Sequence, residues 1–257
     1  MKKELREWAE KYVPQFNELA QKYNTCYYTQ SPLDKVETSP ELMVIGINPA
    51  GTFGGGVDVK DADTFMKGNP CWSQRFTAEG RMAADWERFL WNARLFLGFG
   101  ERYKVSPIDD DSKTVWTNLT PFPSPKGSKD LKSEVLTVGI ESTLELITVL
   151  KPKRIVFMGV GDFKVLDNCC QNMGHAIEHL RIVDSYSLEI GSLDNIPFAV
   201  IPHPCSSKWP LSHKFTSAFV LTHKLSAIEV KGKMRPLKEV AKVMKDELRA
   251  WKKIPIE

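Results

Sequence analysis

The sequence predicts an α/β protein, a three-layer α/β/α sandwich whose central, mainly parallel sheet has four strands. Four short stretches are apolar and rich in β-branched residues, as strands buried inside a parallel sheet are. Helical patterns separate these stretches, and strands that alternate with helices are typical of a doubly wound sheet. We expect the strands over residues 42–47, 114–119, 154–158 and 197–201.

The chain opens with an amphipathic helical pattern. The stretch MKKELREWAEKYV mixes acidic and basic residues and lacks the apolar core of a secretion signal. We therefore expect residues 1–40 to form an N-terminal helical extension and the protein to be cytoplasmic.

Helical periodicity also fills the connections between the expected strands. In residues 82–100, apolar side chains recur on about one face before two glycines end the pattern; the residues are Trp86, Phe89, Leu90, Leu97, Gly98 and Gly100. Further helices are expected before Pro152, after the third strand and over residues 232–257. Residues 185–201 are compatible with a hairpin that pairs 187–190 with 197–201. Without a repeat or a linker, residues 1–257 are expected to be one domain and a monomer.

The composition argues against several classes of protein. An apolar content of 42% and a charged content of 26% are ordinary for a globular chain, and no apolar run reaches the roughly 18 residues of a membrane span. The five cysteines form no Cys-x-x-Cys pair, which gives no support to a disulfide framework, a zinc ribbon or an iron–sulfur cluster. We expect no metal, no cofactor and no membrane partner.

Positive charge is unevenly distributed along the chain. The net charge of +3 is too small to predict a polyanionic partner. Residues 203–228, however, contain lysines and no acidic residue, and local positive charge beside a functional loop can hold phosphates. For the lysine-rich segment from Lys231 onward, we prefer the interpretation of a solvated helix surface.

Unusual residues follow all four expected strands. In such sheets, ligands bind beyond the carboxyl ends of the strands, where the loops converge. The four exits read NPAGTFGGG, NLTPFPSPKG, GVGDFK and HPCSSKWPLSHKF. The first fits neither a P-loop nor a dinucleotide fingerprint, and the third has Lys164 where a dinucleotide turn needs its last glycine. We therefore expect one shared site for a flat ligand that the glycine-rich backbone can approach closely.

The sequence HAIEH, from His175 to His179, is the pattern of inverted zinc proteases, with two imidazoles one helical turn apart. No third ligand can be identified downstream, so we prefer two histidines on a solvated helix face. A zinc hydrolase using His175, Glu178 and His179 remains the alternative from a different enzyme class.

The first and last exits resemble motifs of the uracil-DNA glycosylase superfamily. Members carry G-[QMI]-[DN]-P and H-P-S-P, and this chain reads GINP at residues 46–49 and HPCS at residues 203–206. Asn118 matches the asparagine that members carry at the end of the second strand. The resemblance spans about residues 40–225 and is nearest to the branches with asparagine in the first motif, the single-strand-selective and mismatch-specific enzymes. Ala50 and Cys205 depart from the pattern.

The resemblance implies a DNA-repair glycosylase that hydrolyses the N-glycosidic bond of uracil or a related damaged base flipped out of DNA. It implies that Asn118 reads the amide edge of the base and that His203 stabilises the negative charge that develops on the base. Asn48 would orient the attacking water, because an amide cannot act as a general base. Phe53 is expected to stack on the base, with Phe65 in reserve.

The remaining contacts are implied in the same way. The base pocket would also include Gly46, Ile47 and Pro49. The loop after His203 would contact single- or double-stranded DNA, holding phosphates and filling the gap left by the flipped base; its residues are Ser206, Ser207, Lys208, Trp209, Leu211 and Lys214. The alternative on the same fold is a protein that binds modified bases or nucleotides without hydrolysing them.

Overall fold

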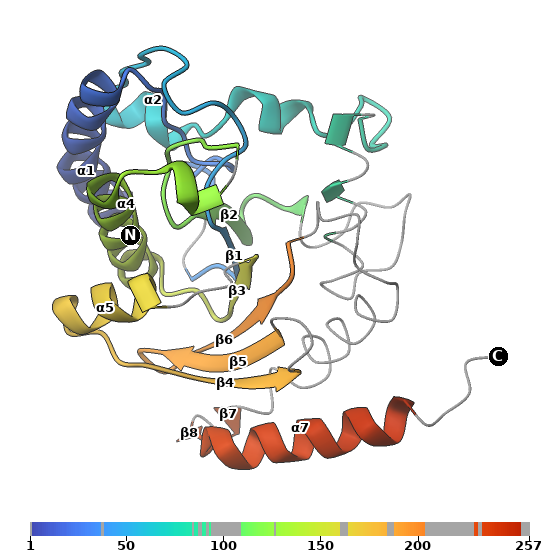
Figure 1. Cartoon of the computed structure of the whole chain (residues 1–257). Coiled ribbons are helices and arrows are strands. Elements are labelled where there is room, and N and C mark those ends of the chain that lie inside the picture. The colour runs from blue at the N-terminus through green and yellow to red at the C-terminus, as the bar shows by residue number, and fades with distance from the viewer. Residues whose placement is uncertain are drawn as a thin grey trace.

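A six-stranded sheet forms the centre of the structure, in the order β2-β1-β3-β6-β5-β4 (Figure 1). The structure is a computed structural model, and it describes residues 2–36, 39–83, 85–86, 89–90, 93, 109–125, 127–159, 164–183, 188–203, 229–230 and 233–252. The strands of this sheet are β1 (Leu42–Gly46), β2 (Thr114–Asn118), β3 (Ile155–Met158), β4 (Ile177–Val183), β5 (Leu188–Leu193) and β6 (Ile196–Ile201). A separate two-stranded sheet consists of β7 (Glu229–Val230) and β8 (Lys233–Met234).

Four of the strands run parallel and coincide with the four expected from the sequence. β1 pairs with β2 on one side and with β3 on the other, and β3 pairs with β6. The register places Gly46 of β1 directly beside Asn118 of β2. The carboxyl ends of all four strands therefore lie at the same edge of the sheet.

The expected sheet of four strands is too small, because β5 and β4 extend it in antiparallel order. β5 and β6 form the hairpin with which the sequence is compatible. Asp194 and Asn195 connect them with φ angles of 49° and 67°, the left-handed conformation that two-residue hairpin turns favour.

The strand β4 occupies a segment that was expected to be helical. The preceding helix ends at Met173, and Gly174 follows with a φ of 78°, the left-handed conformation that terminates helices. The chain then pairs with β5 from Ile177 to Val183. The helical interpretation of HAIEH is therefore wrong.

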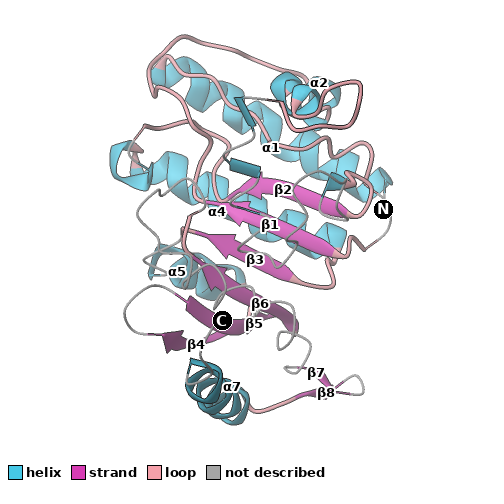
Figure 2. Cartoon of the chain, turned by 90° about the vertical axis from the view of Figure 1, so that its right-hand side faces the viewer, coloured by secondary structure: helices cyan, strands magenta, loops and turns pink. Residues whose placement is uncertain are grey.

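Helices cover both faces of the sheet (Figures 1 and 2). The longer ones are α1 (Lys2–Tyr23), α4 (Ser133–Leu150), α5 (Lys164–Met173) and α7 (Leu237–Lys252), and the short ones are α2 (Ala62–Met66) and the 3-10 helices η1 (Pro70–Gln74) and η3 (Gly127–Asp130). Alternate residues of β1 join different clusters: Met43 and Ile45 pack with α1, α4 and α5, whereas Val44 belongs to the cluster that contains α7.

The helix expected in residues 1–40 is present as α1 and contributes to the main core. Its apolar face is buried, and Trp8 Nε1 donates to the carbonyl oxygen of Ser142 in α4 at 2.8 Å. Of the helix expected over residues 82–100, the described positions 85–86, 89–90 and 93 are helical, and Leu97 lies outside the described residues. Across the described segments, no helix is both long and apolar enough to cross a membrane.

Candidate functional site

A cavity of about 480 Å³ opens at the carboxyl ends of β1, β2, β3 and β6. Each of these strands contributes its last residue or one just beyond it: Gly46, Asn118, Met158 and His203. The loop after β1 adds Asn48, Pro49 and Ala50. Residues separated by up to about 160 positions in the sequence thus line one space, as expected for a sheet of this topology.

The side chain of Asn118 lies across the neighbouring strand β1. A Cβ added to Gly46 would be only 2.5 Å from Asn118 Oδ1, so a larger residue at position 46 would collide with the amide. The backbone carbonyl of Asn118 accepts a hydrogen bond from Thr143 Oγ1 of α4 at 3.0 Å. Within the described part of the chain the side-chain amide of Asn118 has no hydrogen-bond partner, so its donor and its acceptor are available to a ligand.

The amide of Asn48 is held in one orientation. Its Nδ2 donates to the carbonyl oxygens of Pro49 at 2.7 Å and Ser124 at 3.0 Å. Since both partners are acceptors, the nitrogen must face them, and Oδ1 is left as a hydrogen-bond acceptor. The contact with Ser124 also ties the loop after β1 to the loop after β2.

His203 follows the end of β6 and lies against Gly159, the first residue after β3. Gly159 has a φ of 70°, and a Cβ there would be 2.7 Å from the Cβ of His203. Burial lowers the pKa of His203 below its ordinary value of 6.5, because the apolar surroundings disfavour the charged imidazolium. The imidazole is therefore neutral at pH 7 and carries one N–H donor.

Aromatic side chains form a wall of the cavity. Tyr28, Trp86, Phe89 and Trp116 all line it. The ring centroids of Phe89 lie 5.8 Å from Trp116 and 6.3 Å from the imidazole of His203. The oxygen of Tyr28 donates to the carbonyl of Ala50 at 2.8 Å, and burial raises the pKa of this phenol to about 12. Flat, apolar surface thus lies beside the amide and imidazole groups.

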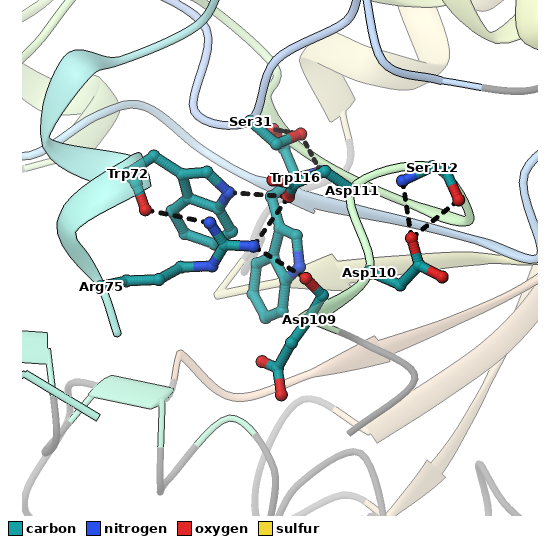
Figure 3. Close-up of polar contacts among 8 residues, drawn as sticks. All are labelled: Ser31, Trp72, Arg75, Asp109, Asp110, Asp111, Ser112 and Trp116. Atoms are coloured by element: carbon teal, nitrogen blue, oxygen red, sulfur yellow. Dashed lines mark hydrogen bonds and ion pairs between the residues drawn. The ribbon is translucent and has the colours of Figure 1, made fainter. Parts of the chain in front are cut away.

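A buried ion pair fixes the segment behind this wall (Figure 3). Arg75 donates to Asp111 Oδ1 at 2.9 Å and to the carbonyl oxygens of Trp72 and Asp109 at 2.9 and 2.8 Å. Trp72 Nε1 donates to the same Asp111 oxygen at 2.9 Å, and its ring packs 5.6 Å from that of Trp116. These contacts clamp η1 to the chain that leads into β2.

Polar residues complete the lining of the cavity. They are Gln30, Asn69, Cys71, Gln74, Asp85 and Thr117. Among them, Gln30 Nε2 is buried without a hydrogen-bond partner in the structure, and a buried donor of this kind is costly unless a ligand or water satisfies it. Asp85 is exposed and is the one carboxylate among the described lining residues.

Three residues expected in the base pocket lie elsewhere. Phe65 is 3% exposed and packs in the core with its ring 5.6 Å from that of Tyr27. Phe53 packs 5.7 Å from Tyr23, and Ile47 packs on the main core; none of the three lines the cavity. The structure therefore does not place the ring of Phe53 or Phe65 in the lining of this cavity.

Three residues of the aromatic wall were missed because they come from segments that are distant from the motifs in sequence. Trp116 was missed although it precedes Asn118 by two residues in β2. Tyr28 precedes β1, and Trp86 and Phe89 follow η1. The helical pattern of residues 82–100 marked Trp86 and Phe89 as an apolar face, but no local signal indicated that this face borders a cavity.

The loop expected to contact DNA cannot be placed. Ser206, Ser207, Lys208, Trp209, Leu211 and Lys214 all lie outside the described residues. The same applies to Cys205. Their expected roles remain predictions.

The histidines of HAIEH do not form a zinc site. His175 Nδ1 lies 2.5 Å from Asp194 Oδ2, and His179 Nδ1 lies 2.9 Å from Glu189 Oε2. Alternation along β4 directs Glu178 to the opposite side from His179. Within the described ranges, no group of three or more histidine, cysteine or acidic side chains is arranged to hold a metal ion. Residues 177–183 therefore form a strand instead of the helix that the zinc hydrolase motif requires, and no metal-binding group is found among the described residues.

No protein-family model matches the chain, and no curated protein matches it in sequence. A functional interpretation must therefore start from the geometry of the cavity.

Proposed function

We propose that the protein is a DNA glycosylase of the uracil-DNA glycosylase type, which removes uracil or a related damaged base that has been flipped out of DNA. One observation carries the proposal: the three residues of the motif resemblance, Asn48, Asn118 and His203, line one cavity with aromatic walls. In this proposal the parallel set β2-β1-β3-β6 is the four-stranded core of an α/β/α sandwich, and β5 and β4 are additions at its edge.

The cavity suits a single flat base. Its volume of about 480 Å³ is in the range of small-ligand sites. The amide of Asn118, which has no partner among the described residues, offers one donor and one acceptor, which complement O4 and N3–H of uracil. The rings of Trp116 and Phe89 offer surface on which the base can stack.

The chemistry needs a positioned water and a group that stabilises the leaving base. Asn48 Oδ1, left free by the two bonds of Nδ2, accepts a hydrogen bond from the water and directs it toward the anomeric carbon. The glycosidic bond breaks as the water oxygen bonds to that carbon, and the electron pair leaves with the base. The N–H of neutral His203 then stabilises the negative charge on O2 of the base. The base anion finally takes up the proton that the water releases.

Incubation with damaged oligonucleotides tests the proposal. Single- and double-stranded substrates containing uracil, hydroxymethyluracil, hypoxanthine or xanthine are treated with the protein and then with alkali, which cleaves the strand at abasic sites. We expect cleavage of at least one of these substrates. If none of these substrates is cleaved, the proposal that the protein is an enzyme is refuted.

A second candidate is a protein that binds a modified base without hydrolysing it. Asn48 supports it, because an amide cannot take a proton from water, and the one described carboxylate of the lining, Asp85, is exposed. Specific binding of a damaged oligonucleotide, with no abasic site formed over a long incubation, would favour this candidate.

A further inference from the structure

A second concave surface lies between α7 and the edge strand β4, which run side by side (Figure 1). It has a volume of about 340 Å³ and shares no lining residue with the candidate site. Five basic side chains line it, Arg181 of β4 and four from α7, and we call this surface the basic groove; the α7 residues are Lys238, Lys242, Lys245 and Arg249. The one carboxylate among its described lining residues is Asp246.

The helix α7 separates its charges by face. At about 100° per residue, its four groove cations at positions 238, 242, 245 and 249 fall within an arc of about 60°. Glu239 and Glu247 lie on a different flank, and Leu237, Val240 and Met244 are buried against the sheet. Within the segment that the sequence predicts to be a solvated, lysine-rich helix surface, the groove cations therefore form a single row beside β4.

Three of the five cations have no anionic partner among the residues that the structure describes. Arg181 pairs with the buried carboxylate of Glu189 at 2.9 Å, and Arg249 pairs with Asp246 at 3.0 Å. Lys238, Lys242 and Lys245 have no carboxylate within 4 Å in the described part of the chain. Like charges three and four positions apart on a helix repel each other, and an anionic partner relieves that repulsion.

The length of the basic groove and the residues that line it indicate which class of anionic partner it fits. The row from Lys238 to Arg249 extends about 16 Å along the helix at 1.5 Å per residue, which suits a partner with regularly repeated charge. The apolar face of α7 is buried on the sheet and is not available to enter a lipid surface. No aromatic anchor of the kind typical of protein interfaces is among the described lining residues.

We propose that the basic groove binds the phosphodiester backbone of a nucleic-acid strand. Lys238, Lys242 and Lys245 contact successive phosphates. Leu180 and Ala241, the apolar residues of the lining, lie under the sugars. The contact depends on backbone charge and not on sequence. This proposed binding is separate from the proposed excision of a base and does not depend on that activity.

The test compares two variants that remove the same charge. The triple variant K238Q/K242Q/K245Q changes the net charge from +3 to 0. The control K3Q/K11Q/K22Q makes the same change on α1, which packs on the opposite face of the sheet. Glutamine preserves helix propensity, and circular dichroism verifies that both variants are folded. The probe is an undamaged, fluorescently labelled single strand of about 20 nucleotides, titrated between about 50 and 200 mM salt.

At the lower salt concentration, we expect the groove variant to bind the strand at least about tenfold more weakly than the unmodified protein. We also expect the slope of log association constant against log salt concentration to be less steep by about 2, because phosphate contacts are lost. The control is expected to bind like the unmodified protein. Equal affinity and equal slope for the two variants would overturn the proposal. So would groove-dependent binding to vesicles of anionic phospholipid without groove-dependent binding to DNA. Because the probe is undamaged, failure of the excision assay leaves this test unaffected.

Discussion

Two glycines make room for the side chains that line the candidate site. Gly46 lies beside Asn118, and Gly159 lies beside His203; a Cβ on either would come within 2.7 Å of that neighbour. In both cases the glycine and the functional residue lie at or just beyond the ends of adjacent strands. The glycine of the GINP motif is therefore needed for a contact between strands, and the glycine that resembled part of a dinucleotide turn instead accommodates a histidine.

The substitution Gly46→Ala tests this contact. The added methyl group would collide with Asn118 Oδ1 and displace the amide, so we expect at least about tenfold weaker binding of a damaged base and a stability loss of about 1–3 kcal/mol. Urea denaturation and binding to a damaged oligonucleotide measure the two effects. Gly191→Ala is the matched control, since its Cβ would collide with Phe198 inside the hairpin. We expect it to lose stability and retain binding; similar binding by both variants would contradict the role of Gly46.

The buried imidazole of His203 makes stability depend on pH. Its pKa in the folded protein lies below the ordinary value of 6.5. As the pH falls, the imidazole of His203 takes up a proton in the unfolded chain before it does so in the folded protein. The stabilisation from burying the neutral ring is therefore fully present above pH 6.5 and is lost as the pH falls through the folded pKa. In urea denaturation from pH 8 to pH 5, we expect the stability difference between the protein and His203→Gln to narrow below 6.5. A difference that is constant over the whole range would refute the assignment.

At the scale of elements, the 3-10 helix η1 forms one side of the cavity, and Arg75 makes several of the contacts that hold it in place. Arg75 joins η1 to the chain before β2, and its guanidinium lies 4.4 Å from the ring centre of Trp72. The side chains of Arg75 and Asp111 are only 6% and 15% exposed. Loss of either side chain therefore removes the ion-pair partner of a group that is largely shielded from water.

The substitution Arg75→Ala is expected to lower the free energy of unfolding by about 3 kcal/mol, because Asp111, a mostly buried carboxylate, would keep, among the described residues, only the hydrogen bond from Trp72 Nε1. Urea denaturation measures the loss. Arg6→Ala is the control, since the ion pairs of Arg6 with Glu10 and Asp63 are exposed and are expected to contribute little. An equal loss in the free energy of unfolding for the two substitutions would show that the contacts of Arg75 do not stabilise the fold.

For the whole molecule, local sequence patterns predicted the strands and helices whose apolar residues are strongly buried and recur at regular spacing. β1, β2, β3 and β6 are buried on both faces, and the helices α1, α4, α5 and α7 have clear apolar faces, so their patterns were readable. β4 was misread because it is an edge strand with little buried surface, and its two histidines have helical spacing.

The sequence predicted the residues of the candidate site that follow strands, but it did not predict the aromatic residues that form its wall. Asn48, Asn118 and His203 follow buried strands whose order fixes where they meet. Apart from Trp116 of β2, the aromatic wall depends on how the segments before β1 and after α2 fold over the sheet. Phe53 and Phe65 were chosen for their closeness to Asn48 in sequence, but helix α1 packs over that region, and Phe65 completes its core.

The central claim is that the cavity at the ends of the parallel strands removes a base with the help of His203. Single-turnover excision of the best-cleaved damaged base tests it most directly, with His203→Ala compared to His175→Ala, whose histidine pairs with Asp194 outside the cavity. We expect His203→Ala to be slower by about 10²–10³-fold, as for loss of a group that stabilises a developing anion, and His175→Ala to keep the rate of the unmodified protein. A rate for His203→Ala equal to that of His175→Ala would contradict the account.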